Sequence, residues 1–301
     1  MRTAYPIIVF LWCCGIVVIA QEQELVNPGF VDDQIDEINK YMTDAAEFKD
    51  DTAKIEANDM VLELMREIMN EPDAFDYSYD SLKHITMLKS KDDMVRVFTW
   101  NIMYDNMRHD FFGFIQFENE DDEYYFYELK DKTSNAPDAD SDYESPGEWY
   151  GAIYYEMIEK KHRNTPVYTL LGWKGRDALV QQKVIETLKF NRHDEPEFGG
   201  GKIQVVREKM NRAVFRYSSQ AQMILRFNEK NDIIVCDHLT PGNPKFKGQY
   251  DYYGPDYSYD AFEWDGKRWN FKSNIDPEIA INYKKNKKIE KIKKRDPSEE
   301  F

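Results

Sequence analysis

The sequence predicts an α+β protein, with N-terminal helices followed by an antiparallel β-sheet that two further helices interrupt. Apolar residues recur at a spacing of three and four before residue 75 and alternate with other residues after it, and helices are again predicted over 148–161 and 178–188. Of the 301 residues, 42% are hydrophobic and 32% are charged. This composition supplies enough apolar material for a buried core and too much for a disordered chain.

Two amphipathic helices are expected within the N-terminal segment, residues 21–75. The first is predicted over 31–48, and the second begins near Asn58 and ends near Pro72, because proline disfavours helix in the residue before it. The apolar residues that share one face are Ile35, Ile38 and Met42 in the first helix, and Val61, Leu64, Met65 and Ile68 in the second. Each helix should bury this face against another part of the fold.

A β-meander is predicted over residues 76–130, where Val95, Val97 and Thr99 alternate with Arg96 and Phe98. Its strands are expected near 84–89, 94–101, 109–117 and 123–129. Twelve acidic and two basic residues lie between 118 and 148, and the segment 131–147 is predicted to be a solvated acidic loop that joins two halves of the fold.

The C-terminal half, residues 148–283, is predicted to mix helices and strands. Beside the helices over 148–161 and 178–188, strands are expected at 167–173, 213–217, 222–227 and 233–237. A hairpin is predicted over 261–271, with Asp265 and Gly266 as a two-residue turn. The chain closes with a basic tail, residues 284–301, in which positions 284–295 hold eight bases and one acid.

The N-terminus has the pattern of an export signal. Arg2 precedes an apolar stretch over 4–19, and Val18 and Ala20 supply small residues before a predicted cleavage after Ala20. An uncleaved membrane anchor is the alternative, although the stretch is at the short limit for a bilayer span. The mature chain would keep Cys236 as its one cysteine and has no Asn-x-Ser/Thr acceptor. These features favour a periplasmic or extracellular bacterial protein without intramolecular disulfides.

Several longer runs resemble a set of uncharacterised exported proteins of Bacteroidota. They are Tyr168–Trp173, Val235–Leu239 and Tyr253–Phe262, together with Val95–Phe117. The resemblance covers roughly residues 76–272. It implies a location in a Gram-negative cell envelope, and it implies no activity.

Charge and motifs argue against several classes of function. The net charge of -16 does not suit a nucleic-acid partner, which requires a surplus of Lys and Arg. No phosphate loop, dinucleotide fingerprint or His-Glu-x-x-His motif occurs, so no cofactor is expected. The segment 138–142 has the alternating acids of a calcium loop but lacks its glycine and its final glutamate. The histidines are scattered, and no metal site is expected.

No catalytic residue can be assigned from the sequence. Asp237-His238 and Ser218-Ser219 lie at predicted strand ends, but no nucleophile elbow is present. Adjacent Asp and His side chains point to opposite faces of a strand, so these two should not pair with each other. Cys236 lies in an apolar run and is expected to be a small buried hydrophobe.

The candidate ligand-binding residues lie in the tyrosine- and aspartate-rich segment 249–260. They are Tyr252, Tyr253, Asp256, Tyr257, Tyr259 and Asp260. Aromatic rings beside carboxylates suit a glycan or a cationic peptide, because rings stack and carboxylates accept hydrogen bonds. The alternative is that the tyrosines seal the rim of a β-fold, with buried rings and exposed hydroxyls.

These observations predict a non-enzymatic exported protein that binds or scaffolds an unknown envelope or extracellular partner. The alternative is a carboxylate-dependent hydrolase that acts on an envelope or environmental polymer, since such an enzyme needs only two acids at a fixed separation. A cleft with convergent acids, one of them with a raised pKa, would favour the hydrolase. The basic tail is expected to make at most a weak contact with an anionic surface.

Overall fold

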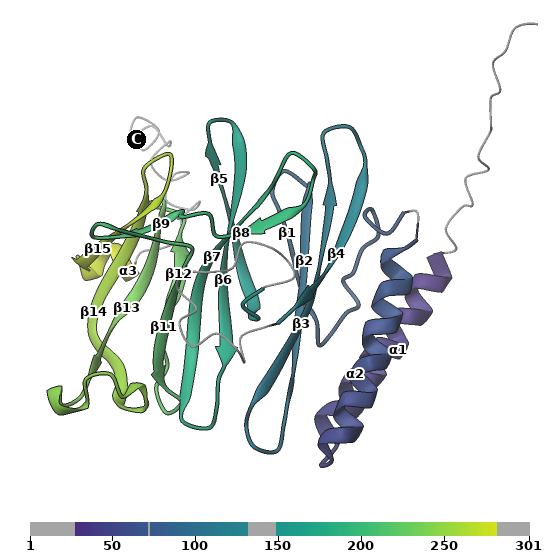
Figure 1. Ribbon diagram of the computed structural model, residues 1–301, viewed down its shortest axis with the longest axis horizontal. Helices are drawn as coiled ribbons and strands as arrows, with labels where there is room; N and C mark the ends of the chain where they lie inside the picture. The colour runs from purple at the N-terminus through teal and green to yellow at the C-terminus, as the bar shows by residue number, and fades with distance from the viewer. Residues whose placement is uncertain (1–27, 72, 132–148, 282–301) are drawn as a thin grey trace, which may run out of the picture.

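The computed structural model of the protein describes residues 28–71, 73–131 and 149–281. It contains three stacked β-sheets, with an N-terminal helical hairpin packed against the first of them. In Figure 1 the layers run from the helical hairpin on the right, through a first and a middle sheet, to a third sheet and a short helix on the left. The helices are α1 (Pro28–Glu47), α2 (Asp51–Met69) and α3 (Pro277–Ile281).

The first sheet is an up-and-down meander. Its order is β1 (Thr86–Lys89), β2 (Val95–Met103), β3 (His109–Glu118) and β4 (Tyr124–Lys130). These are the four strands that the sequence predicts, in the predicted order. The neighbouring strands pair antiparallel throughout.

The middle and third sheets contain the rest of the described strands. The middle sheet has the order β11 (Arg212–Ser218), β7 (Val180–Phe190), β6 (Thr165–Gly175) and β5 (Ile153–His162), with β8 (Pro196–Phe198) paired to β7. The third sheet has the order β10 (Glu208–Met210), β9 (Ile203–Val205), β15 (Trp269–Ile275), β14 (Tyr253–Trp264), β13 (Ile233–Pro241) and β12 (Leu225–Asn228). Only β9 and β15 pair parallel among these described strands.

The predicted α+β class is wrong, because the fold is largely β and no helix interrupts the middle sheet. The segments predicted as helices at 148–161 and 178–188 form β5 and β7. β5 turns into β6 through Arg163 and Asn164, whose φ angles of 49° and 67° suit a tight hairpin turn. β7 is covered on both faces, so its buried polar residues hide the two-residue period.

Three apolar cores hold the layers together, because each strand sends alternate side chains to opposite faces. Phe98, Trp100 and Phe114 of the first sheet pack against α1 and α2. Val95 and Val97, on the other face, pack against the middle sheet. A third core between the middle and third sheets includes Ile185, Ile234, Phe262 and Trp269. The first and middle sheets are therefore buried on both faces.

The two predicted N-terminal helices are present and form a hairpin, and the second helix is longer than predicted. α2 begins at Asp51 instead of near Asn58, and the Asp50 side chain caps it by accepting the Thr52 N–H at 3.1 Å. The first turns of α2 are not evident from the sequence because they contain Lys54. This lysine is buried, and its ammonium pairs with Asp105 at 2.9 Å. A charged residue at a buried position interrupts the apolar pattern.

The predicted hairpin at 261–271 is present, but the predicted two-residue turn is wrong. Trp264 pairs with Trp269, so the loop has four residues, Asp265–Arg268, and only Gly266 among them has a positive φ, 88°. The Asp265 carboxylate accepts the N–H groups of Lys267 and Arg268 and closes the loop. The strands predicted at 167–173, 213–217, 222–227 and 233–237 correspond to β6, β11, β12 and β13.

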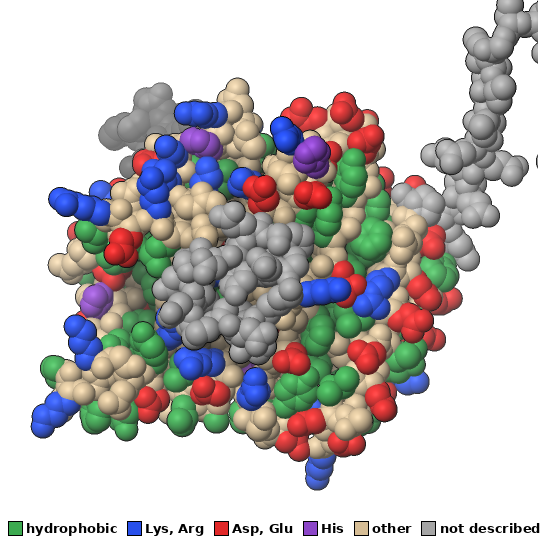
Figure 2. Space-filling model, in the orientation of Figure 1, with side chains coloured by type: hydrophobic (Ala, Val, Ile, Leu, Met, Phe, Trp, Pro, Cys, Tyr) green, Lys and Arg blue, Asp and Glu red, His purple; other side chains and the backbone are tan. Residues whose placement is uncertain are grey.

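Three predictions remain untested because their residues lie outside the described part of the chain: the signal peptide at 1–20, the acidic loop beyond Asp131 and the basic tail at 284–301. Within 28–71, 73–131 and 149–281, no helix is both long and apolar enough to span a membrane. Figure 2 shows acidic side chains gathered on the helical side of this face and lysines and arginines on the side of the third sheet. Charge is thus unevenly distributed over the face shown in Figure 2.

Val206 is a strained residue at the surface. It lies in the two-residue turn between β9 and β10, with a φ of 56° and 80% of its surface exposed. A β-branched residue is strongly disfavoured at positive φ, whereas asparagine tolerates it. We expect Val206→Asn to raise the free energy of unfolding by about 1 kcal/mol in urea denaturation. Val206→Ile, which keeps the β-branch, should leave it unchanged, and equal effects of the two variants would contradict this explanation.

Candidate ligand-binding pocket

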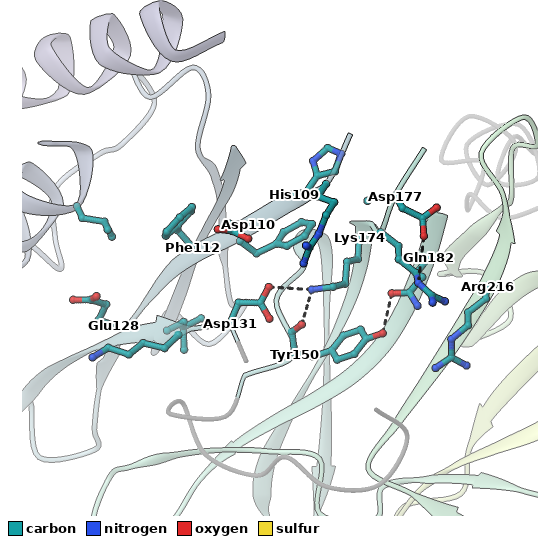
Figure 3. A pocket seen from close by; sticks show the side chains of 17 residues that line it. His109, Asp110, Phe112, Glu128, Asp131, Tyr150, Lys174, Asp177, Gln182 and Arg216 are labelled. Carbon is teal, nitrogen blue, oxygen red and sulfur yellow. Dashed lines mark hydrogen bonds and ion pairs between the residues drawn. The ribbon is translucent and has the colours of Figure 1, made fainter. Parts of the chain in front are cut away.

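A pocket of about 980 Å³ lies between the first and middle sheets. The two sheets approach each other at β1 and β5. On the opposite side, residues of β3 and β4 face the ends of β6, β7 and β11 across the pocket (Figure 3). Its volume is at the upper end of the range for small-molecule sites.

Lys174 forms the floor of this pocket. Its ammonium donates to the carbonyl oxygens of Tyr150 and Gly151 at 2.8 and 2.9 Å and to the Asp131 carboxylate at 3.1 Å, as Figure 3 shows for Tyr150 and Asp131. It also lies 4.3 Å from the centroid of the Phe111 ring. Burial lowers the pKa of Lys174 to about 8, although Asp131 opposes this shift.

Gly151 lets Asp131 reach the lysine. Its φ is 72°, and a Cβ at this position would lie 2.4 Å from the Asp131 carboxyl group. Any other residue would both strain the backbone and push the carboxylate away. We infer that this glycine is required for the ion pair at the pocket floor.

His109, at the start of β3, forms part of the upper wall in Figure 3. Its Nδ1 accepts a hydrogen bond from the Asn101 amide at 2.8 Å, which leaves the proton on Nε2. Burial and the nearby Lys174 lower the pKa of His109, so the ring is neutral at physiological pH. Its ring fits because Gly175 has no Cβ, which would lie 2.5 Å from it.

A buried polar network supports the pocket from behind. Tyr150 donates its hydroxyl to Gln182 at 2.9 Å, and its ring centroid lies 5.0 Å from the Arg212 guanidinium. Arg212 in turn makes a fully buried ion pair with Glu186. Glu186 also accepts the Tyr154 hydroxyl, whose pKa is raised above its usual value by burial and by this carboxylate. Opposing charges and hydrogen bonds therefore fix the ring of Tyr150.

The mouth of the pocket carries arginines. Arg108, Arg176 and Arg216 line it together with Lys130, and with Lys174 they oppose four acids. In the whole chain the acids outnumber the bases by 56 to 40, so the pocket has the opposite balance. Such a local excess concentrates anions, because low-dielectric walls focus the field inside a cleft.

Each of the four acids in the pocket has a partner. Asp131 pairs with Lys174 at 3.1 Å, and Glu128 pairs with Arg66 at 2.7 Å. Asp110 accepts the Tyr104 hydroxyl at 2.6 Å, and Asp177 accepts two backbone N–H groups of its own turn. Each of these contacts occupies an oxygen atom of the carboxylate.

The structure does not bring the six predicted ligand-binding residues into one site. The ring of Tyr252 stacks on Phe246 with centroids 4.0 Å apart, and the Tyr253 hydroxyl accepts the Gly248 N–H at 3.0 Å. Most of the expected loop is the strand β14. Neighbouring side chains therefore point to opposite faces.

The other predicted residues have separate surroundings. Asp256 accepts both the N–H and the hydroxyl of Ser258, whereas Tyr257 is 91% exposed. Tyr259 packs in the small core beneath α3. Asp260 is buried and accepts from the Asn274 N–H at 2.9 Å. None of the six lines the pocket described above.

The candidate catalytic groups do not form a triad in the described part of the chain. The His238 Nδ1 lies 2.7 Å from the Asp260 carboxylate, which accepts its hydrogen bond, and His238 does not pair with the adjacent Asp237, as the strand geometry predicts. The Ser219 hydroxyl donates to the Ala178 carbonyl at 2.7 Å. Cys236 is buried in the core between the middle and third sheets, where burial raises its thiol pKa. It is a packing residue, as predicted.

Sequence reasoning missed the pocket, although one signal was available. Lys174 directly follows the seven-residue run 167–173, which is predicted as a buried strand, and a lysine is rarely buried unless it is paired. Its partners Asp131 and Tyr150 are far away in the sequence, so their convergence depends on the packing of the sheets.

Comparison with known proteins finds no family model, no curated protein and no solved structure that matches this chain. The resemblance to exported proteins of Bacteroidota therefore remains a prediction from the sequence. The class that the fold and the pocket define is a three-sheet β-protein with a cation-lined cleft.

Proposed function

We propose that this is a non-enzymatic binding protein of the bacterial cell envelope, and that its pocket holds a small anionic ligand that also carries hydroxyl groups. The observation that carries the proposal is the set of three arginines around a pocket with a buried ammonium at its floor. Guanidinium groups bind carboxylates and phosphates through paired hydrogen bonds.

The donors available to the ligand are those at the mouth. Lys174 already uses its three N–H donors on Asp131, Tyr150 and Gly151, so it contributes charge to the pocket instead of a direct hydrogen bond. Within the described residues, Arg108 makes no side-chain hydrogen bond or ion pair, and its side chain is exposed. Arg176 has only a 3.5 Å contact with its neighbour Asp177. Both can turn to a ligand.

The partners of the four acids favour binding over hydrolysis. A carboxylate-dependent hydrolase needs one acid positioned to give a proton to its substrate. In this pocket each acid is already in contact with a cation, a hydroxyl or backbone N–H groups of the protein. The predicted signal peptide and the resemblance to exported proteins support the envelope location.

Matched sugar pairs test this function on the mature chain, residues 21–301. We expect galacturonate and glucuronate to raise the melting temperature while galactose and glucose do not, because only the acids engage the arginines. Arg108→Gln and Arg176→Gln should each weaken binding about tenfold in calorimetry, or about 1.4 kcal/mol.

Arg207→Gln is the matched control, since Arg207 is exposed in the turn between β9 and β10, outside the pocket. It should bind as the unmodified protein does. Equal shifts from the acidic and the neutral sugars, or equal losses in all three variants, would refute the proposal.

A further inference from the structure

A second pocket of about 590 Å³ continues the first one. The two share Arg108, Arg176 and Asp177 in their walls, so they form one groove across the ends of β3 and β6. The second pocket extends to η4 (Tyr250–Tyr252), next to β14 of the third sheet. The groove thus crosses from the first sheet to the third.

The boundary between the pockets is a set of planar groups. The Arg216 guanidinium, in the wall of the first pocket, lies 5.5 Å from the ring centroid of Tyr250, in the wall of the second. Arg108 and Arg176 stand at the same boundary. A ligand that extends from one pocket into the other must pass these cations.

The lining of the groove carries both signs of charge. Asp177 and Asp251 lie among the arginines, and Asn106 adds an amide. Hydroxyl groups both donate to carboxylates and accept from guanidiniums, and guanidiniums also bind carboxylates. The lining therefore fits a ligand that carries both hydroxyl groups and carboxylates.

We propose that the natural ligand is an acidic oligosaccharide that occupies both pockets, with one carboxylate-bearing unit over Lys174 and the next units crossing Arg108 and Arg176 into the second pocket. This inference rests on the proposed function and extends it from a single sugar to a chain. A single unit can occupy the first pocket, and the connected second pocket provides contacts that only a longer ligand can make.

Tetragalacturonate compared with galacturonate tests the proposal by calorimetry on residues 21–301. We expect the tetramer to bind at least tenfold more tightly. Leu179→Glu is the diagnostic variant, because Leu179 is 63% exposed and lines the second pocket but not the first. The new charge should repel the tetramer and remove its advantage, with little effect on the monomer.

Val206→Glu is the matched control, since it replaces another exposed apolar residue outside both pockets. It should keep the preference for the tetramer. If the monomer binds and the tetramer is no tighter, or if Leu179→Glu keeps the preference, the groove proposal is wrong and the proposed function stands. If neither binds, both fail. Tighter binding of tetraglutamate than of tetragalacturonate would overturn the assignment to a sugar.

Discussion

Replacement of Arg212 by leucine should lower the free energy of unfolding by about 3–5 kcal/mol. The Arg212 and Glu186 side chains are both fully inaccessible to solvent, and the guanidinium Nε donates to the carboxylate at 2.8 Å. Without arginine, Glu186 would remain as a buried charge whose one other hydrogen bond within the described residues comes from Tyr154. Urea denaturation followed by circular dichroism measures the loss.

A double variant separates the unpaired charge from the lost packing. Arg212→Leu with Glu186→Leu removes both charges and should recover much of the loss, because a buried ion pair gains little over apolar residues of similar volume. Arg207→Leu, at an exposed position, should change stability by less than about 0.5 kcal/mol. If Arg212→Leu loses no more stability than this control, the unpaired charge of Glu186 does not destabilise the protein and the explanation is wrong.

Sequence reasoning succeeded in the helical hairpin and in the meander. α1 and α2 bury one face each, and the strands of the meander, although both faces of their sheet are covered, are joined by short polar loops. A local period then reports the secondary structure directly. The boundaries were less certain, as the early start of α2 at Asp51 shows.

It failed in the middle sheet, whose faces are both covered. β7 buries Gln182, Glu186 and Thr187 beside its apolar residues, and each of them has a hydrogen-bond partner. Buried polar side chains obscure the alternation that marks a strand, so a helix was predicted over 178–188. Only their partners from other parts of the chain explain why these residues lie inside.

The binding site was also missed because it is not local in the sequence. The tyrosines and aspartates of 249–260 predict a ligand-binding segment, but most of this segment is a strand, which places neighbouring side chains on two faces. The pocket instead unites Asp131, Tyr150 and Lys174, which come from three separate segments. Their meeting is a property of the packed sheets, and the sole local sign of it was a lysine in an apolar strand.

The stability of the protein should rise with pH above about 8 because of Lys174. Its pKa is about 8 in the folded protein and near the ordinary 10.5 in the unfolded chain. Between these values the unfolded state binds more protons, so a rise in pH favours the folded state. The full difference corresponds to about 3 kcal/mol. Below about pH 8 the ammonium is present in both states and the gain is absent.

Comparison with Lys174→Met isolates this contribution, because groups such as the buried tyrosines titrate equally in both proteins. We expect the stability of the unmodified protein relative to the variant to increase by about 3 kcal/mol between pH 7 and pH 10.5, measured by urea denaturation. Binding of galacturonate should weaken above about pH 8 for the same reason, since the pocket loses a positive charge. A difference that stays flat with pH, together with a lysine pKa above 10 in an NMR titration of Lys174, would contradict this account of the pocket floor.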